Sequence, residues 1–224
     1  DISNLNFLDR QIKESMEKLK LANAILEEEE KIRRELDEES AKLRVMAALK
    51  EVIEADLLRL SSMIENLAGS KEKSRENGRI ALLLCYVKRS SNLFFRKQET
   101  GFISANELTV YVEELAEIAH YVGVKILVNS SLKEVVSVEQ ARSLYGFAYS
   151  VIDWTAQTEN PHILLYLLEE EGQIVLRFIA SEDLRQFEPN QDLSNAIISS
   201  GGSFACKDLD GVVGISLTFP LGGE

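Results

Sequence analysis

Residues 43–67, LRVMAALKEVIEADLLRLSSMIENL, carry the most regular apolar pattern in this chain. Their apolar side chains recur in steps of three and four residues, which is the period of a coiled-coil seam rather than the wider stripe of a globular helix. The seam consists of Leu43, Met46, Leu49, Ile53, Leu57, Leu60, Ile64 and Leu67. A helix cannot bury such a seam alone, so we predict that two copies of the chain pair along it in parallel.

The same period extends upstream, more thinly, as far as Leu5. No proline or glycine occurs before Gly69, so residues 5–67 are predicted to form one long helix or two helices end to end. A helix of about sixty residues is roughly 90 Å long at 1.5 Å per residue. We expect the rest of the chain to be attached to this helix.

The polar middle of the predicted helix keeps only Ile32 and Leu36 in the seam. Acid–base pairs four residues apart, such as Glu30–Arg34, support a solvated helix in this segment. We interpret residues 1–42 as a signalling coiled coil. The segment around Ile32 and Leu36, where few apolar residues hold the coiled coil together, is either a solvent-exposed part of the coiled coil or a part that shifts register to pass a signal.

A second amphipathic helix follows a short polar link. Residues 69–78, GSKEKSRENG, have the composition of a turn, and residues 79–97 then show apolar residues at helical spacing. Residues 88–92, KRSSN, interrupt that pattern, and we interpret them as a solvated helix face. A short link makes two such helices antiparallel neighbours, so residues 43–99 are predicted to form a dimerisation hairpin. Two copies then form a four-helix bundle.

The remaining residues, 102–224, predict an α+β two-layer sandwich. Serines with a glutamate or glutamine three residues later predict helix starts at Ser104 and Ser137. Turn signals at Glu171–Gly172 and Asp210–Gly211 join pairs of strand-like runs. The predicted elements are helix 104–121, strand 124–128, helix 137–157, strands 162–169 and 173–180, helix 192–200 with Asp192 as its N-cap, and strands 203–207 and 212–219. This order favours helices on one face of a mixed sheet.

The 224 residues have a formal net charge of −12, which argues against binding to nucleic acid or anionic lipid. No run approaches the roughly 18 apolar residues of a membrane span. The sequence begins with Asp1 rather than methionine and shows no signal peptide, which suggests a fragment. The two cysteines are expected to be reduced, which suits the cytoplasm, so we expect a cytoplasmic chain or the cytoplasmic part of a membrane protein. Cys85 and Cys206 show no metal-ligand spacing, and we expect both to be reduced and buried. With two histidines in the chain, no metal site is expected.

The C-terminal residues carry a resemblance to a known family. Residues 199–204 (SSGGSF), Asp210–Gly211 and residues 216–221 (SLTFPL) resemble the closing helix, Gly-Gly turn and final hairpin of the ATPase domain in bacterial sensor histidine kinases. That domain is of the gyrase/Hsp90/histidine-kinase/MutL type. Leu144–Tyr145 and the helix after them resemble its nucleotide-binding helix. Residues 86–93 (YVKRSSNL) are similar to a helix in a subgroup from Gram-positive bacteria.

The resemblance implies a kinase that uses ATP and Mg²⁺ to phosphorylate a histidine on the first bundle helix. This chain has only His120 and His162, and neither precedes residue 104. Where a Leu-His-Asp might stand, residues 36–38 read Leu-Asp-Glu. We therefore expect no phospho-acceptor in the hairpin, and structural or surface roles for both histidines.

The resemblance also places the family's Mg²⁺-binding asparagine at Trp154 and the acidic residue four positions earlier at Ser150. Mg²⁺ takes oxygen ligands, whereas an indole offers only an N–H donor. Asp153 is adjacent, but one residue rotates a side chain by about 100° around a helix. We expect Trp154 to fill the pocket with apolar surface.

The remaining nucleotide-binding positions are altered as well. Glu182 or Asp183 stands near the expected position of the family's adenine-binding aspartate, but the glycine that lets the backbone approach the base is missing. Residues 183–191 form a short loop without glycine, where the family carries a long lid with phosphate cradles. Acidic residues in this region repel a triphosphate.

Because four requirements fail together, we interpret the chain as a degenerate histidine-kinase-like module without catalytic residues, bound cofactor or metal. It is expected to form a homodimer and to relay a signal to a protein partner, such as a kinase or a response regulator. Two alternatives stay open. One is a divergent kinase or ATPase that uses ATP and Mg²⁺ with Asp153 or Glu182 in altered roles. The other is an unrelated coiled-coil adaptor that binds protein through its sheet or its former pocket.

Overall fold

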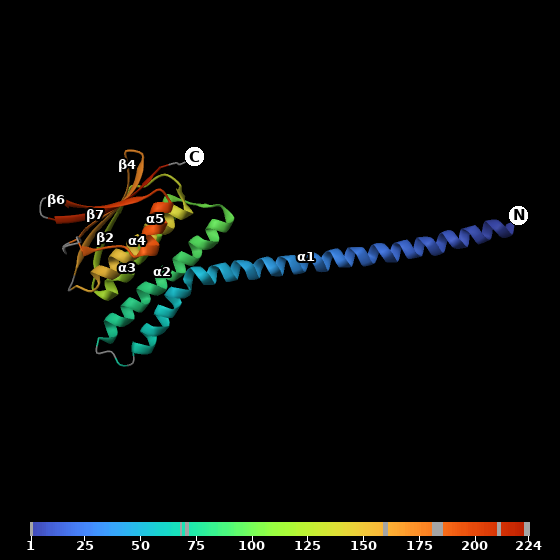
Figure 1. Cartoon of the computed structure of the whole chain (residues 1–224), viewed down its shortest axis with the longest axis horizontal. Helices are drawn as coiled ribbons and strands as arrows, with labels where there is room; N and C mark the ends of the chain where they lie inside the picture. Colours follow the sequence, from blue (N-terminus) through green and yellow to red (C-terminus); the bar gives the residue numbers. More distant parts are fainter. Residues whose placement is uncertain are drawn as a thin grey trace. The chain divides into compact units, whose positions relative to one another are not determined.

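Figure 1 shows the computed structural model of the chain, which describes residues 2–67, 69, 72–158, 161–180, 186–209 and 212–221. The chain divides into two compact units with their boundary between Val52 and Ile53, and each is described by itself. The domain boundaries predicted above, 1–42, 43–99 and 102–224, follow inferred roles and stay a prediction. Within the described ranges no helix combines the length and apolar character that a membrane span requires.

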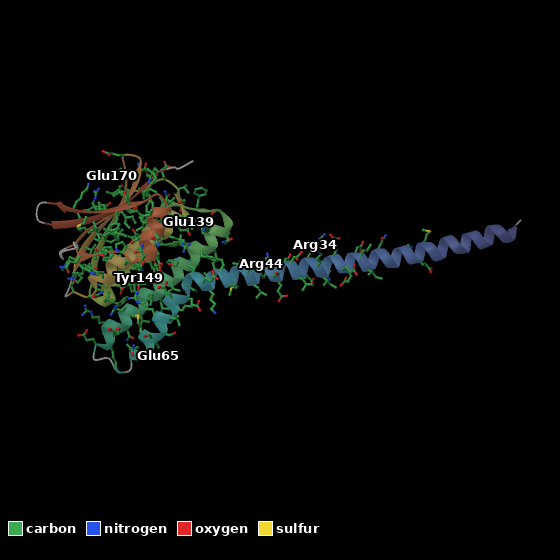
Figure 2. The ribbon with its side chains drawn as sticks, in the orientation of Figure 1. Arg34, Arg44, Glu65, Glu139, Tyr149 and Glu170 are labelled. Atoms are coloured by element: carbon green, nitrogen blue, oxygen red, sulfur yellow. The ribbon has the colours of Figure 1, made fainter. Side chains whose placement is uncertain are left out.

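The first unit is formed by the N-terminal part of helix α1 (Ile2–Leu67), which is one helix rather than two end to end. Charged side chains such as Arg34 project from it (Figure 2). The Arg34 guanidinium lies 2.6 Å from the Glu30 carboxylate, as the spacing predicts. Leu43 and Met46 are 66% and 60% exposed. This unit therefore carries apolar side chains that it does not cover itself.

In the second unit the end of α1 and helix α2 (Lys73–Glu99) form the predicted hairpin. Some residues of the apolar seam are buried within the chain, and others are exposed. Leu60 is 9% exposed and belongs to the same core as Ile80. Three partly buried side chains of α1 pack against this core: Ile53, Met63 and Leu67. Leu57 and Ile64, by contrast, are 41% and 52% exposed. The chain covers one side of the seam itself, and pairing with a second copy stays a prediction for the other side.

Helix α2 begins earlier than the composition suggests. The sequence predicts a turn as far as Gly78, but α2 begins at Lys73, so the prediction is wrong for residues 73–78. Gly78 is buried, and a Cβ atom there would lie 2.6 Å from the carbonyl oxygen of Tyr121. This glycine therefore permits the close approach of α2 to a 3₁₀ turn, η1 (His120–Val122), and does not reverse the chain.

Three helices follow: α3 (Ala105–Ala119), α4 (Val138–Thr155) and α5 (Gln191–Ser199). The predicted capping box of Ser137 and Gln140 is confirmed at the start of α4. Ser104 caps α3 by accepting from the Glu107 amide, while the Glu107 carboxylate accepts from Arg96 at 3.0 Å instead of completing a box. For α5 the predicted cap Asp192 is wrong, because the Asn190 side chain accepts from the Leu193 amide. An asparagine serves an N-cap as well as an aspartate does.

The mixed sheet is confirmed, with the strand order β2-β4-β5-β7-β6. Its strands are β2 (Lys125–Ser130), β4 (His162–Glu170), β5 (Gln173–Ala180), β6 (Ser203–Leu209) and β7 (Val212–Pro220). β2 and β4 are parallel and the other neighbours are antiparallel. The predicted turn after β4 is confirmed by positive φ angles of 51° at Glu171 and 75° at Gly172. The turn predicted at Asp210–Gly211 lies outside the described residues.

A short second sheet pairs β1 (Phe102–Ile103) with β3 (Val136–Ser137), and the sequence analysis does not predict it. Two-residue strands have too few positions to show an alternating pattern. The main core lies between the large sheet and the helices, with α3 and α4 on one face of the sheet (Figure 1). Leu144, Phe178 and Leu217 in this core have no exposed surface.

The prediction of two buried cysteines is confirmed for Cys85 and wrong for Cys206. Cys85 lies on α2 with its sulfur 3.6 Å from the hydroxyl of Tyr145. Cys206 lies on β6, which is the last strand of the sheet and has only β7 as a neighbour. An edge strand leaves more of its side chains in solvent.

Candidate functional site

The last turn of α4 holds two of the predicted site residues, Asp153 and Trp154, and they face different surroundings. The capping box at Ser137 sets where α4 begins, and the helix continues to Thr155. Thr155 is buried, and its hydroxyl donates to the carbonyl oxygens of Val151 (2.9 Å) and Ile152 (3.0 Å). Successive side chains on a helix diverge by about 100°, so adjacent residues in this turn meet different elements.

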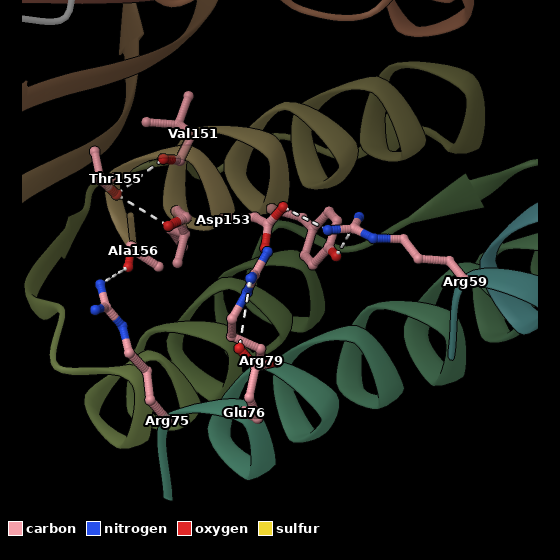
Figure 3. Close-up of polar contacts among 10 residues, drawn as sticks. Arg59, Arg75, Glu76, Arg79, Val151, Asp153, Thr155 and Ala156 are labelled. Atoms are coloured by element: carbon pink, nitrogen blue, oxygen red, sulfur yellow. Dashed lines mark hydrogen bonds and ion pairs between the residues drawn. The ribbon is translucent and has the colours of Figure 1, made fainter. Parts of the chain in front are cut away.

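The Asp153 carboxylate lies between two arginines of the helical hairpin (Figure 3). Its Oδ2 is 2.7 Å from Nη2 of Arg59 on α1, and its Oδ1 is 3.6 Å from Nη2 of Arg79 on α2. Burial works to lower the pKa of Arg59, but the hydrogen bond with Asp153 and the electrostatic interactions with Tyr149, Asp153 and Asp56 together outweigh it, and the pKa is raised. Two guanidinium groups thus neutralise the acidic side chain in this turn.

The Arg59 guanidinium also joins a tyrosine cluster. Its Nη1 donates to the hydroxyl of Tyr149 at 3.0 Å. The ring of Tyr149 stacks on Tyr86 of α2, with 4.3 Å between ring centroids. Burial raises the pKa of Tyr149, and the nearby negative charge of Asp153 raises it further. Tyr149 therefore stays protonated at neutral pH.

Arg75 and Arg79 of α2 also contact the last turn of α4 and the residues just after it. The Arg79 guanidinium lies near the carboxylates of Asp153 and, at 4.0 Å, Glu76. Its Nε is buried and has no hydrogen-bond partner among the described residues. Arg75 donates from Nη2 to the backbone oxygens of Ala156 and, at 3.1 Å, Thr158, just beyond the end of α4 (Figure 3). The hairpin therefore contacts both the side chains and the backbone at this end of the helix.

Trp154 lies in apolar surroundings. Its ring meets the buried ring of Phe187 edge-on, with 6.1 Å between centroids. Phe187 in turn contacts Phe147 at 5.5 Å, and Phe147 lies 6.1 Å from Phe178 in β5. Ser150, one turn earlier on α4, is half-buried. These aromatic rings offer no oxygen ligand to a metal ion.

The remaining candidate residues are two acidic residues and two histidines. Glu182 and Asp183 lie outside the described residues. His120 is exposed in the 3₁₀ turn after α3, and His162 is exposed at the start of β4. In the part of the chain that the structure describes, no group of three or more His, Cys, Asp or Glu side chains is arranged to hold a metal ion.

The sequence analysis missed Arg59, Arg79, Tyr149 and Phe187. Arg59 stands between Leu58 and Leu60, where helical spacing predicts only a polar position beside the seam. No local pattern connects it to a residue 94 positions later. For Phe187 a signal was present but was not used: an aromatic residue within a polar loop indicates a buried contact.

A second ionic cluster corrects the interpretation of residues 88–92 as a solvated face. Arg89 lies over the ring of Tyr111, 4.4 Å from its centroid, and forms an ion pair with Glu114 on α3. Lys88 approaches the same carboxylate at 3.1 Å. Burial raises the pKa of Glu114, but the bonds from Arg89 and Lys88 outweigh it, so the pKa lies below its ordinary value.

No family model matches this sequence, and no curated protein matches it. The fold is similar to that of solved histidine kinases. The blue-light activated histidine kinase of Erythrobacter litoralis EL346 is 15% identical, with a TM-score of 0.50 over 80% of this chain and 63% of that chain. The histidine kinase domain of the same protein is 14% identical (TM-score 0.47, 73% and 94% covered), and the Acinetobacter baumannii histidine kinase AdeS is 10% identical (TM-score 0.42, 78% and 98% covered). The first of these confirms the predicted fold class, a long helix and helical hairpin followed by a sandwich like that of a histidine-kinase ATPase domain.

Proposed function

We propose that this chain is a signalling module of the sensor-histidine-kinase type that passes a signal without phosphorylating itself and without ATP turnover. The observation that carries the proposal is the last turn of α4, where the resemblance expects a Mg²⁺ ligand. Trp154 packs there against Phe187, and the adjacent carboxylate of Asp153 pairs with Arg59 and Arg79. Mg²⁺ prefers oxygen ligands, and a carboxylate in two ion pairs is a poor ligand for it.

The histidines support the same proposal. Phosphoryl transfer to this family's acceptor needs a histidine on the first bundle helix, and the whole sequence contains only His120 and His162. His120 belongs to η1 and His162 to β4, so both lie in the sandwich part of the chain. Neither α1 nor α2 contains an imidazole that accepts a phosphoryl group.

The exposed apolar side chains of α1 support the dimeric part of the proposal. Leu57 and Ile64 remain exposed after Leu60 has been buried within the chain. Exposed leucine and isoleucine at seam positions are stabilised when a second helix covers them. We therefore propose a homodimer through the hairpin and a protein partner, such as a kinase or a response regulator, that receives the signal.

The divergent-kinase alternative gives Asp153 a catalytic or metal-binding role. The ion pair of Asp153 with Arg59 speaks against that role, because a metal ion would have to compete with two fixed guanidinium groups. The adaptor alternative is a structural coiled-coil protein, unrelated to two-component signalling, that binds protein through its sheet or its former pocket.

The test is calorimetric titration of the chain with Mg-ATP, combined with thermal unfolding and incubation with ATP radiolabelled at the γ-phosphate. We expect no heat, no change in Tm and no label on the protein. A ligand at 100 times its Kd would stabilise the fold by about 2.7 kcal/mol, which thermal unfolding readily detects. Micromolar binding of Mg-ATP would contradict the loss of nucleotide binding, and transfer of label would establish the kinase alternative.

A further inference from the structure

Strand β2 leaves one edge of the large sheet open. Within the described residues β2 pairs only with β4, and the strand order places it at the end of the sheet. The Lys125 amide donates to the Pro161 carbonyl at 3.0 Å, and the Ser131 amide donates to the Leu167 carbonyl at 2.9 Å. Backbone groups of alternate residues in a parallel strand point to opposite sides. The amide and carbonyl groups of Ile126 and Val128 therefore point away from the sheet and are free to pair with another strand.

A groove of about 780 Å³ runs beside this edge, between α3 and β2. Its accessible apolar surface comes mainly from Ile126 and Val128, which are half-buried, while Ala116 and Val124 also line it but are buried. At the end away from this groove's His120 and Lys125, α3 and β2 are linked by the hydroxyls of Thr109 and Ser130, which lie 2.8 Å apart. An open strand edge beside an apolar groove is the arrangement to which extended peptides add as an extra strand.

The charges on the groove favour a basic occupant. Glu113 and Glu117 stand four residues apart on α3, both line the groove, and both are exposed. Neither carboxylate forms an ion pair with another residue of the described part of the chain. Lys125 and His120 line the groove as well, where α3 ends and β2 begins.

Natural proteins protect open strand edges with charged residues, and Lys125 is the one lysine of β2. It is, however, the first residue of the strand, and the five residues that follow it, Ile126 to Ser130, are uncharged. Most of the edge is therefore without this protection.

We propose that the groove between α3 and β2 binds an extended segment of a partner protein that carries lysine or arginine and apolar residues at every second position, so that both kinds of side chain lie on the face of the added strand toward α3. The segment pairs with the outward amide and carbonyl groups of Ile126 and Val128. Its apolar side chains enter the groove, and its cationic side chains reach Glu113 and Glu117. A partner strand of about six residues, roughly 20 Å, matches the length of β2. The inference does not depend on the state of the nucleotide pocket.

The test selects phage-displayed random twelve-residue peptides on the full chain and measures the affinity of the enriched peptides by fluorescence anisotropy. The variant E113K/E117K reverses the charge of the groove. The variant E35K/E39K makes the same change of charge at the same four-residue spacing on α1, where both side chains are exposed. Amide hydrogen exchange with and without peptide locates the binding site.

We expect enriched peptides with basic and apolar residues at every second position, at least tenfold weaker binding by E113K/E117K, and less than a twofold change for E35K/E39K. Bound peptide should slow exchange at the amides of Ile126 and Val128, and N-methylation of the peptide amides that face β2 should abolish this effect. Enrichment of peptides without basic residues, equal losses in both variants, or protection outside residues 124–130 would overturn the proposal. Protection of β2 that rises with protein concentration in the absence of peptide would show that a second copy of the chain is the occupant, which also overturns it.

Discussion

The guanidinium of Arg59 on α1 and the carboxylate of Asp153 on α4 lie 2.7 Å apart, although 94 positions separate the two residues in the sequence. This pair attaches the helical hairpin to α4, the helix that resembles the nucleotide-binding helix of the histidine kinases. It also occupies the one carboxylate of the last turn of α4. The same contact therefore bears on stability and on the proposed loss of Mg²⁺ binding.

The variants Arg59→Met and Asp153→Asn should each destabilise the chain, by about 1–3 kcal/mol, because each removes one partner of a partly buried, charged hydrogen bond. Urea unfolding followed by the fluorescence of Trp154, the only tryptophan, measures the change. The double variant should cost less than the sum of the single variants, since the two residues interact directly. Strictly additive losses would contradict a stabilising contact.

Glu114 should make stability depend on acid pH. Its pKa lies below the ordinary value of 4.5, so its contribution is complete above that value and is lost as the pH falls through the lower pKa of the folded state. Glu114→Gln should therefore destabilise the chain at pH 7 and have a smaller effect at pH 3, measured as urea midpoints. The neighbouring variant Glu113→Gln should have little effect at either pH, because Glu113 is exposed and outside this cluster.

Gly78→Ala should destabilise the chain by about 1–3 kcal/mol, because the added Cβ meets the carbonyl oxygen of Tyr121 at 2.6 Å and forces α2 away from η1. Gly69→Ala is the matched control, since its nearest atom would be the Asn66 carbonyl oxygen at 3.8 Å. The control should change stability by less than about 0.5 kcal/mol. Thermal unfolding of both variants makes the comparison, and equal Tm values would show that α2 does not need a glycine there.

The two sides of the hairpin seam should respond differently to substitution. Leu57→Glu combined with Ile64→Glu should convert a dimer to a monomer in analytical ultracentrifugation while the circular dichroism spectrum stays helical, because both side chains are exposed in the single chain. Leu60→Ala should instead lower stability by about 2–3 kcal/mol, since this side chain is buried within the chain. A chain that is monomeric without any substitution would contradict the proposed homodimer.

Thiol reactivity should distinguish the two cysteines. Cys206 is exposed on β6, whereas Cys85 is buried and burial raises the pKa of its thiol. Because the thiolate is the reactive form, a disulfide reagent at pH 8 should modify one thiol per native chain quickly and the second only after unfolding. The Cys206→Ser variant should show no fast phase, and a fast phase in that variant would place Cys85 within reach of solvent.

Local signals in the sequence were sufficient for much of the fold. The capping box at Ser137 and Gln140 is confirmed because both of its bonds form between residues three positions apart. The turn at Glu171–Gly172 is confirmed for a similar reason, since it depends on the conformations that neighbouring residues tolerate. The helical hairpin and the mixed sheet were predicted from the periodicity of apolar residues and from the order of the elements, and both can be read directly along the sequence.

The sequence by itself thus determined the long helices and the strands of the large sheet, their order, and the absence of a histidine from α1 and α2. The tertiary structure decided which seam residues the chain buries, why Gly78 is a glycine, and which groups meet Asp153. Leu60 and Leu57 are equivalent in the sequence pattern, and only the packing of α1 on the core buries one and exposes the other. The physical reason is range: backbone conformation and helical spacing act between neighbours, whereas an ion pair such as Arg59–Asp153 forms only after packing has brought distant elements together.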